Sequence, residues 1–268
     1  LLREIGGALF DSIFFGERLL TEWRVARSLI RRGEPRRVLR LALEFGDPRF
    51  ERLPWESLYD RSERSFLALD PEICVMRRVP GTDASSLPPV APLRVLGVIA
   101  QPRGVATLDT AREKAVLTDG LKEQIERNAV QLDWLNGHER AVTLEALRER
   151  LALSEQADRP YHLLHFIGHA SWDETKQTGV VWFEDERRDA EPVDGDALAD
   201  VLPASLRMVV LNACEGARNE DTVPFRSVTS ALMEHSSLPA VIASQVRLRD
   251  VSARHFTPAF YRTLADYR

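Results

Sequence analysis

From residue 93 onward, apolar and polar positions follow a pattern that predicts strands separated by helices. Short continuous apolar runs, such as 93–100 and 208–211, are typical of strands that are buried on both faces. Between the runs lie segments in which apolar residues recur at helical spacing, such as 143–153. Strands separated by helices of this length predict a parallel sheet covered by helices on both faces, and therefore an α/β fold.

The same pattern places the individual elements. Strands are predicted at 93–101, 129–135, 161–168, 206–213 and 239–246, with one arm of a hairpin at 179–185. Helices are predicted at 107–128, 143–153, 194–203, 226–236 and 251–267, the last bent or restarted near Pro258. Thr143 is the expected N-cap of its helix, because a threonine oxygen can accept a hydrogen bond from a free N–H of the first turn.

Residues 1–90 follow a different pattern. Helical spacing predicts one or two helices over 1–32, and two strand-like segments then flank a short apolar helix or turn at 53–60. The segment 80–92 is rich in Pro, Ser and small residues, which is typical of a linker or a long crossing loop. We therefore expect a smaller half at 1–90 and a larger half at 91–268.

Composition and charge narrow the class of protein. The chain has 268 residues, of which 44% are hydrophobic and 29% are charged, as in a soluble globular protein. The net charge of -5 argues against direct nucleic-acid binding, and the basic cluster at 27–40 is more typical of a solvated helix end and loop. No apolar run is long enough to span a bilayer and no signal peptide opens the chain, so we expect no membrane association.

The two cysteines, Cys74 and Cys214, are too far apart in the sequence to suggest a disulfide framework. Their strand-like surroundings indicate reduced thiols and a cytoplasmic protein, in which we expect Cys74 to be structural. The chain starts without Met and stops within a helical pattern, so we expect one domain of a longer protein.

Two candidate reactive residues follow apolar runs of the predicted sheet. His169 comes directly after the strand at 161–168, and Cys214 directly after the strand at 206–213. Because the carboxyl ends of parallel strands meet at one edge of a sheet, both residues are expected at the same edge, although spacing does not say whether their strands are neighbours. A nearby imidazole can take the proton of a thiol, whose free pKa is about 8.5, and so generate a nucleophile.

Three histidines, His162, His165 and His169, also raise the question of a metal site. On a strand, positions 162 and 165 lie on opposite faces, and zinc ligands usually come with carboxylates or thiols at tighter spacing. We therefore expect no metal, and we expect His162 and His165 to be core residues or to support His169.

Charged residues near the predicted edge leave the substrate preference open. Asp173, Glu174 and Glu215 are most simply solvated loop charges, but they could orient the histidine or bind a basic side chain. Arg247 and Arg249 could instead bind an acidic side chain.

Five stretches, in order along the chain, resemble the CHAT domains, which are caspase-like domains of the same clan as caspases and separases. These stretches are "LPWESLYD" (53–60), "HFIGHA" (165–170), "VVLNACEG" (209–216), "AVIASQVRLRD" (240–250) and "FTPAFYRTL" (256–264). The resemblance implies a caspase-like three-layer sandwich with a mostly parallel sheet at 91–268. It also implies that the smaller α/β half at 1–90 is a non-catalytic, pseudo-caspase-like half.

The resemblance also implies roles for individual residues. His169 would be the general base and Cys214 the nucleophile that attacks a peptide carbonyl. The backbone N–H groups of Ala170 and Cys214 would form the oxyanion hole, although Ala170 stands where the family usually has Gly. A loop after the last strand would line the substrate cleft with Ser244, Gln245 and Val246.

These inferences predict a cysteine endopeptidase that cleaves a protein partner without a cofactor or a metal. The resemblance further implies a regulated effector in prokaryotic antiviral defence or cell death, controlled by a repeat or ligand-sensing module or a partner protein. Two alternatives stay open: a catalytically silent caspase-like interaction module within a larger protein, and a metal-dependent hydrolase.

Overall fold

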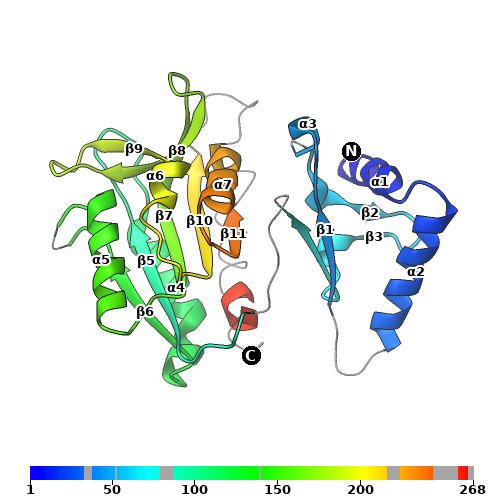
Figure 1. Cartoon of the computed structure of the whole chain (residues 1–268), viewed down its shortest axis with the longest axis horizontal. Helices are drawn as coiled ribbons and strands as arrows, with labels where there is room; N and C mark the ends of the chain where they lie inside the picture. The colour runs from blue at the N-terminus through cyan, green and yellow to red at the C-terminus, as the bar shows by residue number, and fades with distance from the viewer. Residues whose placement is uncertain are drawn as a thin grey trace. The chain divides into compact units, whose positions relative to one another are not determined.

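The computed structural model describes residues 1–32, 38–51, 53–78, 87–138, 140–215, 224–243 and 259–264. The chain folds as two compact units, Leu1–Asp83 and Ala84–Arg268, called unit 1 and unit 2 below (Figure 1). The division falls within the Pro- and Ser-rich segment 80–92. Each unit has a hydrophobic core of its own.

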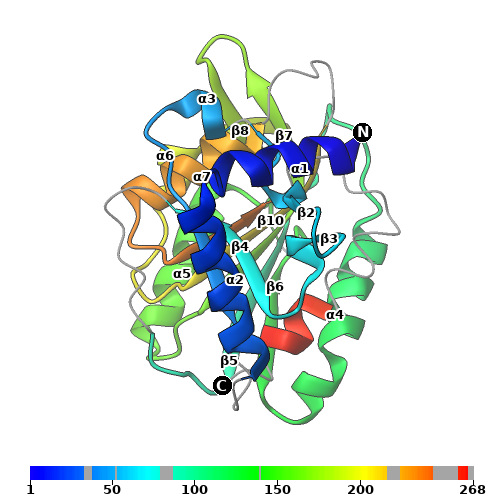
Figure 2. The same cartoon turned by 90° about the vertical axis from the view of Figure 1, so that its right-hand side faces the viewer.

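Unit 1 packs two longer helices against short strands. Its helical elements are α1 (Leu2–Ile13), α2 (Glu17–Arg32), α3 (Pro48–Glu51) and the 3-10 turns η1 (Trp55–Ser57) and η2 (Leu67–Leu69). Its strands are the parallel pair β1 (Leu39–Leu43) and β4 (Ile73–Arg77) and the antiparallel pair β2 (Tyr59–Asp60) and β3 (Ser65–Phe66). Figure 2 turns α1 and α2 toward the viewer. Phe10, Trp23 and Trp55 are buried in the core of this unit.

Unit 2 contains a mostly parallel sheet of seven strands. They are β5 (Leu93–Ile99), β6 (Val130–Leu135), β7 (Leu163–Asp173), β8 (Thr178–Glu184), β9 (Ala190–Asp194), β10 (Met208–Glu215) and β11 (Ala240–Ala243). The parallel strands follow the order β11-β10-β7-β5-β6. The hairpin of β8 and β9 joins the end of β7 antiparallel, at the top of the unit in Figure 1. The predicted parallel sheet and hairpin arm are confirmed.

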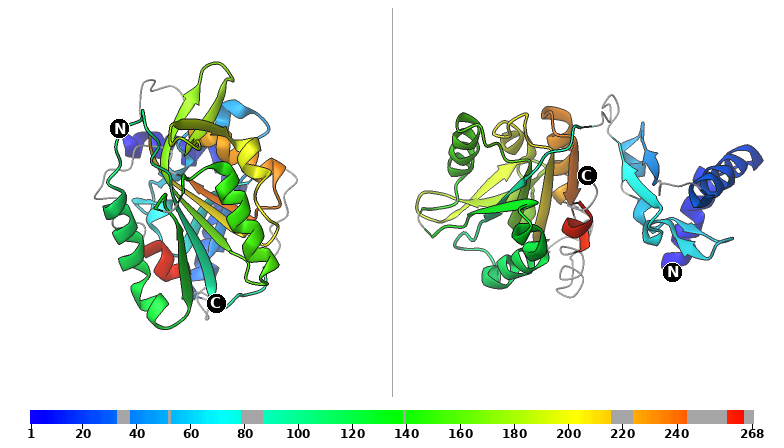
Figure 3. Two further views of the ribbon diagram at one scale, coloured as in Figure 1. Left: turned by 90° about the vertical axis from the view of Figure 1, so that its left-hand side faces the viewer. Right: turned by 90° about the horizontal axis from the view of Figure 1, so that it is seen from below.

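Helices cover both faces of this sheet, which makes the predicted caspase-like three-layer sandwich. One face carries α4 (Thr110–Glu126), and the other carries α5 (Leu144–Gln156), α6 (Gly195–Ala199) and α7 (Pro224–His235). The right-hand view of Figure 3 shows α4 and α5 on opposite sides of the strands. Residues 259–264 are helical and bury Tyr261 on the α4 face. Among the described residues, no helix has the length and apolarity needed to cross a membrane.

The N-cap predicted at Thr143 is confirmed. Its Oγ1 accepts a hydrogen bond from the N–H of Ala146 at 2.9 Å, which satisfies a donor of the first turn of α5 that has no partner within the helix. Asp109 and Asp194 cap α4 and α6 in the same way. These caps begin helices close to the carboxyl edge of the sheet, where the candidate residues lie.

The strands that carry the two candidate residues are longer than the sequence predicts. β7 continues to Asp173, because its last five residues pair with β8. β10 continues to Glu215, because it stays paired with β7 over its whole length. His169 and Cys214 therefore lie inside paired strands, and the expectation that they follow the strand ends is wrong.

Candidate active site

Cys214 and His169 are direct partners in the sheet. β10 and β7 are neighbouring parallel strands, and their register pairs the Cα atoms of these two residues. Neighbouring strands run about 4.8 Å apart, and paired positions lie on the same face of a sheet. Val210, which shares this face with position 214, belongs to the same apolar cluster as Leu117 of α4. The two candidate positions therefore lie together on the face that α4 covers.

His169 is a buried histidine, and one of its ring nitrogens has no partner in the part of the chain that the structure describes. Its side chain is 5% exposed, and its Nε2 is buried without a hydrogen-bond partner among the described residues. A buried polar atom without a hydrogen bond costs about 1–3 kcal/mol, so such atoms are rare unless they have a use. An imidazole nitrogen in this state is available to a thiol or to a bound substrate.

Trp182 lies on the other side of His169. In the antiparallel pair of β7 and β8, the Cα atoms of His169 and Trp182 are partners. The indole Nε1 of Trp182 donates a hydrogen bond of 2.9 Å to Oγ of Ser171, two residues further along β7. Positions 214, 169 and 182 therefore form a row across three neighbouring strands.

A carboxylate lies close to this row on the same face. Asn212, two residues before Cys214 in β10, donates from Nδ2 to Oε2 of Glu113 at 3.2 Å. Glu113 belongs to the first turn of α4, so this contact ties the helix to the strand that carries the cysteine. Sequence reasoning missed Glu113, because nothing in the helical pattern distinguishes it from a solvated acid.

A family model for the CHAT domain matches residues 5–268 of the chain. This chain belongs to the CHAT domain family. The match extends over both units, and it confirms the resemblance found in the sequence. CHAT domains are related to caspase-like cysteine proteases, which agrees with the three-layer arrangement of unit 2. No curated protein matches the chain in sequence.

The other two histidines of the motif in this CHAT domain have separate environments. His165 is buried, and its Nδ1 shares a hydrogen bond of 2.7 Å with the hydroxyl of Tyr261. Burial lowers the pKa of His165 to about 3 and raises the pKa of Tyr261, so both are neutral at pH 7. His162 accepts a hydrogen bond from the N–H of Arg94 at 3.0 Å, at the opposite end of the strands.

No group of three His, Cys, Asp or Glu side chains in the described part of the chain could hold a metal ion. A cavity of about 480 Å³, lined by Arg94, His162 and Gln131 among others, lies where β5, β6 and β7 begin. The candidate dyad lies at the other end of these strands, so this cavity is separate from it.

The remaining predicted site residues of the CHAT domain divide into two groups. Ala170 is buried inside β7, where its Cα pairs with Glu215 of β10 and Val181 of β8. Its place is therefore inside a paired strand, beyond residue 168, where the sequence predicted that the strand ends. The cleft residues Ser244, Gln245 and Val246 lie outside the described residues.

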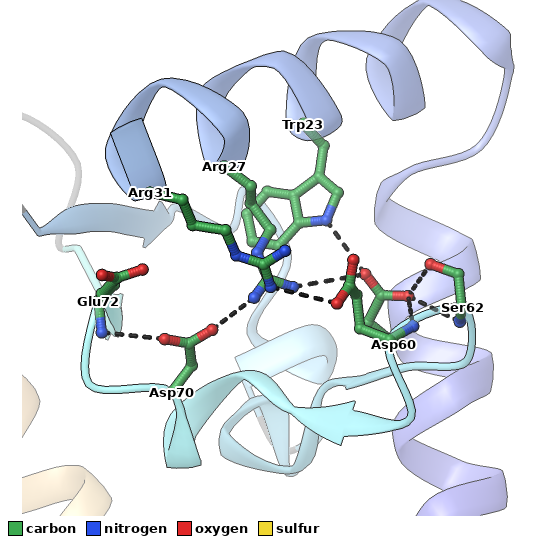
Figure 4. Close-up of polar contacts among 8 residues, drawn as sticks. Trp23, Arg27, Arg31, Asp60, Ser62, Asp70 and Glu72 are labelled. Carbon is green, nitrogen blue, oxygen red and sulfur yellow. Dashed lines mark hydrogen bonds and ion pairs between the residues drawn. The ribbon is translucent and has the colours of Figure 1, made fainter. Parts of the chain in front are cut away.

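A second buried polar cluster lies in unit 1 (Figure 4). Arg27 of α2 is 7% exposed, forms an ion pair with Asp70 and lies 3.8 Å from Asp60. Asp60 also accepts hydrogen bonds from Ser62 and, at 3.4 Å, from Nε1 of Trp23. Burial alone would raise the pKa of Asp60, but these hydrogen bonds outweigh burial and hold the pKa below its usual value.

This cluster is typical of a structural ion-pair network. It adjoins a cavity of about 350 Å³, where Arg31 also pairs with Glu63 at 3.1 Å, so positive and negative groups face each other throughout. Arg27 falls in the basic segment 27–40, which the sequence predicted to be solvated. That prediction is wrong for Arg27, because Asp60 and Asp70 supply the opposite charges from distant parts of the chain.

Proposed function

We propose that this CHAT domain is a cysteine endopeptidase in which Cys214 is the nucleophile and His169 the general base. The observation that carries the proposal is the register of β7 and β10, which makes the two residues direct partners. The Nε2 of His169 supports it, because this atom has no hydrogen-bond partner among the described residues and a general base needs a nitrogen that no structural hydrogen bond occupies. Membership of a family related to caspase-like proteases supports the reaction class.

In the proposed reaction, His169 takes the proton of the Cys214 thiol, and the sulfur attacks the carbonyl carbon of a peptide bond. The tetrahedral intermediate collapses, the C–N bond breaks, and His169 gives the proton to the leaving amine. Water then attacks the thioester and gives a proton to His169. The C–S bond breaks, and His169 returns that proton to the sulfur. One water is consumed and no cofactor takes part.

The backbone N–H groups of Cys214 and Ala170 are the proposed donors to the oxyanion of the intermediate. Ala170 pairs with Glu215 at the last position of the ladder between β7 and β10. Its N–H can serve a substrate only when the ladder opens at this last pair. The role of Ala170 therefore requires a small rearrangement of the end of β10 on substrate binding.

The wider function is proposed on the family resemblance. We infer a regulated effector of prokaryotic antiviral defence or cell death that acts on a protein substrate in the cytoplasm. Unit 1 would be its non-catalytic half, because both proposed catalytic residues belong to unit 2. A repeat or ligand-sensing module, or a partner protein, would control the activity.

The direct test of this function is a comparison of new protein amino termini in cells. Cells would express either the wild-type protein or Cys214→Ala, with the neighbouring genes present. We expect amino termini that appear only with the wild type and that are also lost in His169→Ala. Cys74→Ser is the matched control, because Cys74 is an exposed thiol on β4 and its loss should leave these termini in place. Identical sets of amino termini in all four samples would refute an endopeptidase.

One observation favours the alternative of a catalytically silent interaction module. His169 is only 5% exposed, so a substrate has little access to it in this state. A silent module would keep its partner bound without cutting it. Capture of the same partner by the wild type and by Cys214→Ala, with no new amino terminus in that partner, would support a silent interaction module over an endopeptidase.

A further inference from the structure

We propose that Trp182 forms the wall of the pocket for the residue that follows the scissile bond, and that it selects a large apolar or aromatic side chain there. This inference rests on the proposed endopeptidase function and deepens it. Its basis is the row of positions 214, 169 and 182 on three neighbouring strands.

The chemistry gives this row a direction. The acyl half of the substrate becomes bonded to the sulfur of Cys214, whereas the amine half receives its proton from His169. The leaving amine therefore lies near His169, and the chain that follows it extends away from Cys214. Trp182 is the partner of His169 on the side opposite Cys214. Directly paired side chains in an antiparallel ladder have their Cβ atoms about 5 Å apart, so the side chains of Trp182 and His169 start from neighbouring positions on the same face.

Trp182 is also exceptional in its own strand. Between Gly179 and Glu184, all residues of β8 except Trp182 are buried, and Trp182 is half-buried. Its indole N–H is already used by Oγ of Ser171 at 2.9 Å, and this contact fixes the ring. A ring held in this way offers a carbon surface and no free hydrogen-bond donor. Such a surface suits a large apolar or aromatic side chain, which can stack on it.

The test is the cleavage of a library of peptides derived from a digested proteome, read by mass spectrometry on both sides of each cut. We expect the wild-type chain to prefer large apolar over small residues after the cut by about five- to tenfold. Trp182→Ala should bring this preference close to unity and leave the preference before the cut unchanged. Trp182→Phe should keep most of the preference.

Trp172 offers a matched control. It is half-buried, it lies in β7 three residues after His169, and strand alternation places it on the opposite face. Trp172→Ala should therefore leave both preferences as in the wild type. An unchanged preference after the cut in Trp182→Ala would overturn this inference and leave the proposed function intact. A library with no cuts that depend on Cys214 would overturn the proposed function itself, and the inference with it.

Discussion

At the scale of single residues, His165 and His169 show how the same side chain can have opposite roles on one strand. Both are buried on the same face of β7. His165 has a partner, the hydroxyl of Tyr261, whereas the Nε2 of His169 has none among the described residues. A satisfied buried imidazole stabilises the fold, and an unsatisfied one is free to react. This contrast, together with the register, separates the proposed base from its neighbour.

The first prediction concerns the hydroxyl of Tyr261. Tyr261→Phe keeps the ring but leaves Nδ1 of His165 buried without its partner, which should lower the free energy of unfolding by about 1–3 kcal/mol. Chemical denaturation of the full chain, followed in the unit that carries each substitution, measures this change. Tyr59→Phe is the control, because the described residues show no hydrogen bond to its hydroxyl. This substitution should lower the free energy of unfolding by less than about 1 kcal/mol. Equal losses in the two variants would contradict this account of His165.

At the scale of elements, the sequence predicts the alternation of strands and helices in unit 2 well, because the apolar runs and helical spacing are local signals. It fails where an element depends on a distant partner. The last residues of β7, from Ser171 to Asp173, are polar or aromatic and become a strand because β8 pairs with them. The two-residue strands β2 and β3 are likewise too short to leave a pattern in the sequence.

The side chains of the candidate site also divide into those that local sequence patterns reveal and those whose place depends on a distant partner. The positions of His169 and Cys214 could be chosen from their motifs and from the strands before them. Glu113 and Trp182 could not, because the first lies on a helix and the second in a hairpin arm whose pairing the sequence does not specify. The burial of Arg27 also depends on Asp60 and Asp70, which lie far away in the sequence.

At the scale of the whole molecule, the order of strands is what brings the candidate dyad together. A parallel sheet could be predicted from the alternation, but its order, β11-β10-β7-β5-β6, could not. Only the resemblance to CHAT domains indicated that the strands of His169 and Cys214 act together. The family match supports a relation to caspase-like proteases, and the register makes sheet partners of the two residues to which the resemblance gives catalytic roles.

The two units should respond to acid in different pH ranges. In unit 2, the pKa of His165 is lowered from its usual 6.5 to about 3, so below pH 6.5 the unfolded state takes up the proton first and stability falls until about pH 3. The loss is at most about 1.4 kcal/mol per pH unit. In unit 1, the lowered pKa of Asp60 gives stability that is present above its usual 3.8 and is lost as the pH falls through the folded value.

Hydrogen exchange of the full chain, resolved by peptide and corrected for the intrinsic effect of pH, tests this order. Between pH 6.5 and pH 4.5 protection should fall in peptides from the strands of unit 2 and hold in those around Asp60. His165→Gln should reduce the loss in unit 2, because the glutamine does not take up a proton on unfolding. Loss of protection in unit 1 at a higher pH than in unit 2 would contradict this order.

The most direct measurement of the central claim is the rate at which iodoacetamide alkylates Cys214 at pH 7, in a Cys74→Ser background that removes the exposed thiol. If His169 activates the thiol, His169→Ala should slow alkylation by about tenfold or more, because an adjacent imidazole raises the fraction of reactive thiolate. His235→Ala, at an exposed position on α7, should leave the rate unchanged. Equal rates with His169 and with Ala at this position would show that the two partners in the sheet do not form a reactive pair.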